Sequence, residues 1–304
     1  MKLDEIKLTT LEDLRRYKPK NKYFVGLDSD GTIFDSMELK HKDCFIGSLI
    51  RVFGLAAITH EIHEVWNFVN IYSYTRGTNR FKALLHTFNY LKKIERIKLL
   101  NVEIPDLKDL NDWVKSGKTL SNKNLIEFMM HLPEKRKKIL KNVVKWSKEV
   151  NQIIKSTVFN LPPMNGALKA LEKLKSKADL MVISNTPFNT LIREWNENNI
   201  YSNIEYIGGQ ETGTKTEMLS AATKNNYPKE NILVIGDSPG DLSAAQSVNA
   251  LFFPILSQRE EESWEFFNQI GFKHFFNGTY FGKYQKSQIK NFQLSLHSKP
   301  SWLD

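Results

Sequence analysis

The feature that most constrains the fold of this chain is an alternation of short apolar runs with helical patterns. It occurs in two separate stretches, residues 23–28 and 160–275. Residues 37–159, which lie between them, carry helical patterns and almost nothing that is typical of a strand. Short apolar strands joined by helices are typical of a parallel sheet that is covered on both faces. We therefore expect an α/β fold with a parallel sheet whose sequence is interrupted, after the first strand, by a large all-α insert.

The sequence predicts the elements of this sheet one by one. The candidate strands are Tyr23–Leu27, Asp179–Ser184, Ile204–Ile207, Ile232–Ile235 and Leu251–Pro254. The helical patterns that separate the later strands are Asn165–Lys175, Phe188–Asn198, Thr216–Asn225 and Pro239–Ser247. Each of the last four strands thus follows or precedes a helix that can connect parallel strands.

Two domains follow from this division. Residues 1–36 and 160–304 form the expected Rossmann-like core, and residues 37–159 form the expected helical domain. Pro162 and Pro163 block a helix and stiffen the chain where it returns to the core. The segment from Lys283 onward is polar and weakly patterned, and we expect it to be partly disordered or to pack on the core.

Composition narrows the class of protein. Hydrophobic residues make up 41% and charged residues 25% of the 304 residues, which is ordinary for a globular protein. The single cysteine, Cys44, rules out an intrachain disulfide and a cysteine-cluster zinc site. No apolar run approaches 18 residues, so no transmembrane helix and no membrane partner are expected. The charged N-terminal segment does not resemble a signal peptide, and we expect a cytoplasmic protein.

The net charge of +9 is concentrated in part on one segment, Glu134–Lys155. Its apolar residues recur at helical spacing, and its lysines occupy the other positions, which predicts a long amphipathic helix with a solvated basic face. A nucleic-acid-binding face is the alternative. However, no zinc-finger, helix-turn-helix or RNA-recognition signature accompanies the lysines, so no nucleic-acid partner is expected.

Polar clusters follow four of the predicted strands. They are Asp28–Thr32, Ser184–Thr186, Gly208–Lys215 and Gly236–Asp241. Because the carboxyl ends of parallel strands lie at one edge of a sheet, we expect these clusters to converge there, where α/β proteins bind ligands. Any one cluster alone is typical of turns and helix caps. Four of them in this order indicate an active site.

The order and spacing of these clusters resemble the haloacid dehalogenase superfamily. The matching motifs are Asp-Ser-Asp-Gly-Thr at 28–32, Ser-Asn-Thr at 184–186, Lys215, and Gly-Asp-Ser-Pro-Gly-Asp at 236–241. The resemblance covers the core. It also implies that the helical insert is a mobile cap, placed as in β-phosphoglucomutase and phosphoglycolate phosphatase.

A carboxylate can accept a phosphoryl group as an aspartyl-phosphate, and Asp28 is the predicted nucleophile. The reaction requires alignment and charge neutralisation, for which Mg²⁺ with its preference for oxygen ligands is suited. The family pattern assigns metal carboxylates to Asp28 and Asp237 and a backbone carbonyl ligand to Asp30. It makes Asp241 a weak ligand or a residue that orients Lys215 or a metal-bound water.

Asp30, two residues after the nucleophile, is the predicted general acid and base. Dehalogenases of the superfamily lack an acid at this position, so Asp30 favours phosphate chemistry over carbon–halogen cleavage. Ser184 and Asn185 are expected to bind the phosphate, together with Lys215. Lys215 lacks the proline that often follows this lysine in relatives, and Lys224 is the other candidate.

The predicted cap contains a loop, Tyr74–Phe81, that resembles a Gly-x-x-Arg substrate loop of the β-phosphoglucomutase group. Arg76 and Arg80 would recognise a second anionic group of the substrate. Two solvated arginines in a helix–helix turn are the alternative. The three tryptophans of the insert, Trp66, Trp113 and Trp146, are expected in its core.

The sequence thus predicts a phosphoric monoester hydrolase: a magnesium-dependent phosphatase that acts on a small phosphorylated metabolite. A phosphomutase would use the same residues and return the phosphoryl group to an intermediate. An inactive relative that serves as a binding or scaffold protein is the alternative outside the enzymes, and the complete set of catalytic residue types argues against it.

Overall fold

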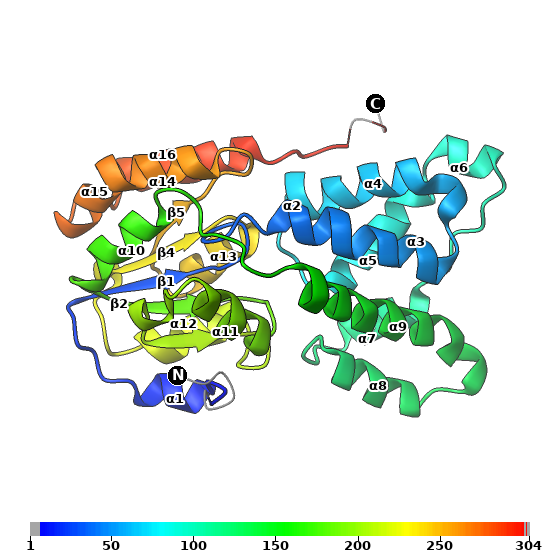
Figure 1. The fold of residues 1–304 in the computed structure, drawn as a ribbon, viewed down its shortest axis with the longest axis horizontal. Helices are drawn as coiled ribbons and strands as arrows, with labels where there is room; N and C mark the ends of the chain where they lie inside the picture. The colour runs from blue at the N-terminus through cyan, green and yellow to red at the C-terminus, as the bar shows by residue number, and fades with distance from the viewer. Residues whose placement is uncertain (1–6, 301, 303–304) are drawn as a thin grey trace. The chain divides into compact units, whose positions relative to one another are not determined.

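The computed structural model describes residues 7–300 and 302, which form two compact units (Figure 1). We call the first the α/β unit; it comprises the described residues up to Met37 and Phe159–Leu296. We call the second the helical unit; it comprises Glu38–Val158 and the described residues that follow Leu296. The chain therefore passes between the units three times.

The α/β unit contains one sheet of five parallel strands in the order β3-β2-β1-β4-β5. The strands are β1 (Tyr23–Leu27), β2 (Ala178–Ile183), β3 (Tyr206–Gly208), β4 (Ile232–Gly236) and β5 (Leu251–Pro254). This arrangement confirms the expected α/β fold. The bounds of β1 and β5 are as predicted, whereas β3 begins two residues later than expected, because its pairing with β2 begins at Tyr206.

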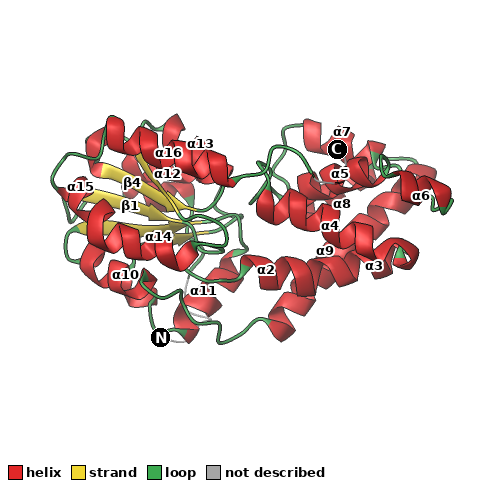
Figure 2. Ribbon diagram, turned by 90° about the horizontal axis from the view of Figure 1, so that it is seen from above, coloured by secondary structure: helices red, strands yellow, loops and turns green. Residues whose placement is uncertain are grey.

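Helices cover both faces of this sheet (Figure 2). Successive strand residues point to opposite faces, so Val25 and Leu27 pack in one apolar core and Phe24 packs in the other. Both cores are buried, which explains why the strands are continuously apolar rather than alternating. The central strand β1 carries the first polar cluster into the middle of the sheet edge.

The helices of the α/β unit follow the predicted pattern closely. They are α1 (Leu11–Arg16), α10 (Ala167–Lys175), α11 (Phe188–Glu197), α12 (Lys215–Thr223), α13 (Pro239–Ser247), α14 (Glu260–Phe266), α15 (Phe272–Phe276) and α16 (Lys283–Ser295). Helix α13 has the predicted bounds, and α12 begins at Lys215 itself.

The segment after Lys283 is ordered as helix α16, which packs against β5. Its apolar contacts come from Ile289, Phe292 and Leu296, which join the core that also holds Phe252. This stripe is narrow and the rest of the helix is polar, so the amphipathic pattern in the sequence is weak.

The helical unit contains its own apolar core. Trp66, Trp113 and Trp146 are fully buried, as expected. Its α-helices are α2 (Met37–Leu39, which begins at the last residue of the α/β unit), α3 (Gly47–Phe53), α4 (Thr59–Asn67), α5 (Arg80–Leu91), α6 (Glu95–Leu99), α7 (Lys108–Lys115), α8 (Asn122–Met130) and α9 (Glu134–Thr157). Two π-helical segments, Lys40–Ile46 and Phe68–Tyr72, continue α2 and α4. Helix α9 is the predicted basic amphipathic helix. No helix among the described residues has both the length and the apolar character needed to span a membrane.

The C-terminal segment departs from the predicted domain assignment, which placed residues 297–304 in the core. The backbone N–H of His297 donates to the carbonyl of Tyr72 at 2.7 Å. The ring of Trp302 meets Phe68 and Tyr90 edge-on, with centroids 5.5 and 6.2 Å away. The described residues after Leu296 therefore belong to the helical unit. Aromatic contacts of Trp302 attach this segment to the helical unit, and the polar residues around it in the sequence gave no sign of them.

Candidate active site

Asp28 is the first residue after β1, and its side chain is buried. Its backbone N–H donates to the carbonyl of Ile235 at 3.0 Å, which extends the pairing of β1 with β4 by one residue. Its Oδ1 accepts a hydrogen bond from the Ser29 backbone N–H at 2.8 Å. The other oxygen, Oδ2, is directed to a different partner, Lys215.

The loop after Asp28 turns sharply back on itself. The carbonyl of Ser29 accepts hydrogen bonds from the backbone N–H groups of Thr32, Ile33 and Phe34. Gly31 adopts a φ of 73°, a left-handed conformation that strains any residue with a Cβ. The turn therefore requires the glycine that the sequence motif contains.

Two tryptophans hold this loop from different helices. The indole N–H of Trp195 in α11 donates to Ser29 Oγ at 3.1 Å, and that of Trp264 in α14 donates to the Thr32 carbonyl at 2.7 Å. Both side chains are fully buried. The sequence did not reveal this role because each tryptophan occupies an apolar helix position that packing alone explains.

Lys215 connects Asp28 with the end of β4. Its Nζ lies 2.7 Å from Asp28 Oδ2 and 2.6 Å from Asp241 Oδ1, and all three side chains are buried. Lys215 is the first residue of α12, and the capping box of Thr214 and Glu217 fixes where that helix begins. Lys224, the alternative lysine, is exposed at the other end of the same helix.

Asp241 is fixed by the start of α13. Its Oδ2 accepts hydrogen bonds from the backbone N–H and the Oγ of Ser238, at 3.1 and 2.6 Å. A Cβ built on Gly236 would lie 2.3 Å from Asp241 Cγ, so the glycine at the end of β4 is what allows this carboxylate to approach the strand. Ser238 holds one of its oxygens and Lys215 lies at the other, so Asp241 is placed to orient Lys215.

A buried acidic cluster results at the carboxyl ends of β1 and β4. Asp28, Asp237 and Asp241 each offer a carboxylate oxygen within 4.8 Å of the others. Asp237 also accepts a hydrogen bond from Thr32 Oγ at 3.4 Å. Three carboxylates carry more negative charge than Lys215 can balance, and oxygen ligands with a charge deficit of this kind suit Mg²⁺. The residues present therefore fit the predicted metal.

Burial and the crowding of charges in this cluster shift the pKa values of two groups. Burial raises the pKa of the Asp28 carboxyl well above its usual range; Lys215 opposes this, and Asp241 and Asp237 add to it. For Lys215, burial works against the charged form, but the attraction of Asp241 and Asp28 raises its pKa above the usual range. The Lys215 ammonium thus stays charged, and further positive charge would stabilise the carboxylates around it.

Asp30 lies in the same loop and is held by two hydroxyl groups. Thr186 Oγ1, from the loop after β2, donates to Asp30 Oδ2 at 2.7 Å, and Ser36 Oγ donates to Oδ1. The sequence identified Thr186 only as part of its motif and gave it no role. Its position shows that the clusters after β1 and β2 meet around the proposed acid.

Ser184 is buried at the end of β2, where its backbone N–H donates to the Gly208 carbonyl at 3.0 Å. Its Oγ accepts a hydrogen bond from the Thr186 backbone N–H at 3.3 Å, which leaves the hydroxyl hydrogen available to a ligand. Asn185 is exposed beside it. The structure thus gathers all core residues of the predicted site at one sheet edge.

The two predicted cap arginines lie in the helical unit and make contacts within it. Arg76 is buried, and its Nη1 donates to the Ile71 carbonyl at 2.9 Å. Arg80 Nη1 donates to Asn151 Oδ1 at 2.6 Å and to the carbonyl and Oγ of Ser147. Its guanidinium also lies 5.1 Å from the ring centre of Phe45, and burial lowers the pKa of Arg80 to about 10. A structural role explains these contacts, and the specificity role stays a prediction.

Comparison with protein families gives one match, which covers more than half of the chain. Residues 79–255 match the model of the family described as haloacid dehalogenase-like hydrolase. The matched stretch includes Ser184, Lys215, Asp237 and Asp241, and it begins after the loop that contains Asp28. Among curated proteins, none is similar enough to count as a match.

Several solved structures are similar at low sequence identity. A haloacid dehalogenase-like hydrolase from Streptococcus pneumoniae is 16% identical, with 80% of this chain and 90% of that chain covered and a TM-score of 0.39. A predicted phosphoglycolate phosphatase from Haemophilus somnus is 14% identical, with 77% and 85% covered and a TM-score of 0.47. A predicted phosphatase from Clostridium acetobutylicum is 17% identical, with 81% and 91% covered and a TM-score of 0.42.

Proposed function

Because the chain belongs to the haloacid dehalogenase-like hydrolases, we propose that it is a magnesium-dependent phosphatase that hydrolyses a small phosphorylated metabolite through an aspartyl-phosphate. The observation that carries the proposal is the position of Lys215, 2.7 Å from Asp28 in a buried cluster of carboxylates. A lysine in this position can neutralise both the attacking carboxylate and an incoming phosphoryl group.

The proposed metal ligands are Asp28, Asp237 and the backbone carbonyl of Asp30. When bound, Mg²⁺ would supply the positive charge that the carboxylates lack and would polarise phosphate oxygens. Asp241 would act through Lys215, because its own oxygens accept hydrogen bonds from Ser238 and Lys215.

In the first step, a carboxylate oxygen of Asp28 attacks phosphorus, and the bond from phosphorus to the ester oxygen breaks. Asp30 gives its proton to the departing alkoxide, so the product leaves as an alcohol. Ser184 and Lys215 hold the phosphoryl oxygens during this transfer, since both are fixed by neighbouring backbone or carboxylate contacts.

In the second step, Asp30 removes a proton from a water molecule, and the water oxygen attacks phosphorus. The bond between phosphorus and Asp28 breaks, which restores the carboxylate and releases inorganic phosphate. The hydrogen bonds from Thr186 and Ser36 would keep Asp30 oriented through both steps.

The test is a panel of phosphorylated metabolites and p-nitrophenyl phosphate, assayed for released phosphate with Mg²⁺ and after exhaustive chelation. We expect turnover that requires Mg²⁺ and that Asp237→Asn weakens while the fold persists. Full activity after chelation would contradict the metal-dependent mechanism. An isomerised product without free phosphate would indicate a phosphomutase, and halide release from a haloacid without phosphatase activity would contradict the role of Asp30.

A further inference from the structure

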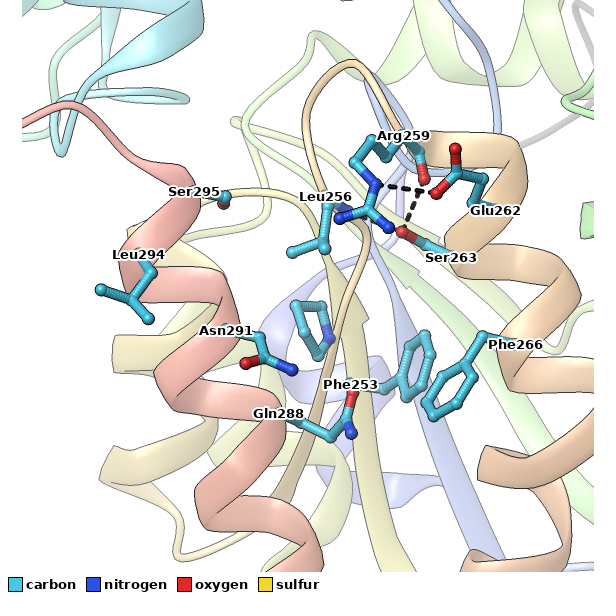
Figure 3. Close-up of a pocket in the computed structure, with 11 residues that line it drawn as sticks. Phe253, Leu256, Arg259, Glu262, Ser263, Phe266, Gln288, Asn291, Leu294 and Ser295 are labelled. Atoms are coloured by element: carbon cyan, nitrogen blue, oxygen red, sulfur yellow. Dashed lines mark hydrogen bonds and ion pairs between the residues drawn. The ribbon is translucent and has the colours of Figure 1, made fainter.

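A second cavity lies within the α/β unit, apart from the acidic cluster. It has a volume of about 610 Å³, is open to solvent, and is lined by the end of β5, the loop that follows it, α14 and α16 (Figure 3). Volumes of this size hold small organic molecules. None of the residues proposed for catalysis lines it.

One side of the cavity is apolar. Phe253, Pro254, Leu256 and Phe266 contribute to its lining, and the rings of Phe253 and Phe266 are stacked at an angle of 23° (Figure 3). Phe253 is buried, whereas Phe266 retains 37% of its surface exposed. An aromatic face that remains accessible in a cavity favours a flat, apolar group that can stack on it.

The opposite side carries side-chain amides without protein partners. Gln288 in α16 is only 8% exposed, and among the described residues nothing accepts from or donates to its amide. Asn291 follows three residues later, on the same side of the helix, and lines the same cavity. The Gln288 amide lines the cavity with its donors and acceptor still reachable from solvent, so it can pair with a group that the cavity receives.

The charged residues at the cavity balance each other. Arg259 Nε lies 2.7 Å from Glu262 Oε2, so the two side chains form an ion pair. Ser263 Oγ donates to the Arg259 carbonyl and accepts from the Leu256 backbone N–H, so its hydrogen bonds are already made. The pair therefore contributes no net charge that selects an anion or a cation, and Gln288 and Asn291 are the amides that line the cavity.

We propose that this cavity binds a neutral planar heterocycle whose edge carries both hydrogen-bond donors and acceptors, of the kind that a nucleoside base presents. The ring would stack on Phe266, and the amides of Gln288 and Asn291 would pair with its edge. An amide offers one acceptor and two donor positions, which matches such an edge without a change of protonation.

The site is adjacent to the catalytic edge but does not depend on it. Pro254, which lines the cavity, is paired with Gly236, and Gly236 directly precedes Asp237. Binding is measured in its own right, so the inference stands or falls separately from the phosphatase proposal.

The experiment is calorimetric titration of the full chain with adenosine, guanosine, cytidine and uridine, with ribose as the sugar-only control. We expect at least one nucleoside to bind and ribose not to bind. Gln288→Leu should weaken this binding about 2- to 10-fold, the equivalent of one net hydrogen bond. Without ligand, the same variant should melt at an equal or higher temperature, because the amide that it removes makes no hydrogen bond to another described side chain.

Gln246→Leu, the same replacement at an exposed position of α13, is the matched control and should leave the affinity unchanged. Asn291→Leu supplies a second test at an exposed site if Gln288→Leu does not fold. The inference is overturned if no nucleoside binds, if ribose binds equally well, or if neither α16 variant alters the affinity. A lower melting temperature of unliganded Gln288→Leu would likewise overturn it, since the amide would then have a structural partner.

Discussion

The two units of the molecule hold charged side chains in different surroundings. In the α/β unit, Asp28, Asp237 and Asp241 lie together around Lys215. In the helical unit, the guanidinium of Arg80 is surrounded by neutral groups, namely the carbonyl and hydroxyl of Ser147, the amide of Asn151 and the ring of Phe45. Like charges gathered in one place destabilise a folded protein, so their presence indicates a function that offsets the cost.

The net charge of the two units shows a different distribution: the excess of positive charge lies in the helical unit. Residues 38–158 contain 22 Lys and Arg against 12 Asp and Glu, whereas the rest of the chain contains 21 and 22. Much of this excess is on exposed positions of α9, where ion pairs contribute little to stability. The comparison teaches that the arrangement of a few buried charges locates the chemistry better than the count of charges does.

The comparison is tested most severely by Asp28→Asn. If the buried cluster exists for catalysis, this change should abolish turnover, because an amide cannot form the aspartyl-phosphate. The fold should persist, since an amide of the same shape replaces a buried carboxyl whose pKa is raised, so that its charged form is disfavoured there. The measurement is phosphate release together with a thermal unfolding curve.

Asp35→Asn is the matched control, because Asp35 is an exposed aspartate in the same loop. It should retain activity close to that of the unchanged protein. If both variants were equally inactive, the loop would be sensitive to any substitution, and the special role of Asp28 would be contradicted.

Asp30→Asn sharpens the comparison within the α/β unit. It should remove proton transfer alone and lower the rate about 10²- to 10⁴-fold, the usual contribution of a general acid or base. The loss should be smaller for p-nitrophenyl phosphate than for an alkyl phosphate, because the aryl leaving group requires less protonation. Equal losses on both substrates would show that Asp30 is not the acid.

Much of the α/β unit could be predicted from the sequence because its signals are local. Strands buried on both faces are continuously apolar, so β1 and β5 were predicted with their observed bounds. The clusters at the strand ends could be expected to converge because all five strands are parallel. Connectivity and topology together therefore placed Asp28, Ser184, Lys215 and Asp237 at one edge.

The contacts that the sequence could not reveal depend on side-chain packing between distant segments. Trp195 and Trp264 donate to the loop after β1 from helices that lie more than 150 residues later in the chain. Thr186 reaches Asp30 only because β2 and β1 are neighbours. Helix α16 and the attachment of Trp302 to the helical unit rest on a few aromatic contacts within polar sequence.

The pH dependence of stability provides a third test of the buried cluster. Burial raises the pKa of Asp28 well above its usual range, so the folded state holds a proton that the unfolded state has released. The stabilisation is complete below the ordinary pKa of aspartate and is lost as pH rises through the raised value, at up to about 1.4 kcal/mol per pH unit for one proton. Lys215, whose pKa is raised, is protonated in both states between pH 5 and 8 by the usual lysine range and adds no slope there.

Denaturant unfolding of the metal-free protein over this range should therefore show a free energy of unfolding that decreases as pH rises. Asp28→Asn should flatten the slope, because the titrating group is removed. A slope that is the same in both proteins would place the titration elsewhere and would weaken the contrast between the two units.

The smallest expected effect concerns Arg80, whose role decides whether only the α/β unit positions charged side chains for function. Arg80→Lys keeps the charge but loses the planar fork that contacts Ser147 and Asn151, so the free energy of unfolding should fall by about 0.5–1.5 kcal/mol. Hydrolysis of p-nitrophenyl phosphate should stay unchanged. Arg16→Lys, at an exposed ion pair with Glu12, is the control and should have little effect. A rise in KM confined to a substrate with a second anionic group would instead show that Arg80 recognises the substrate, as its loop suggested. The helical unit would then also position a charged side chain for function.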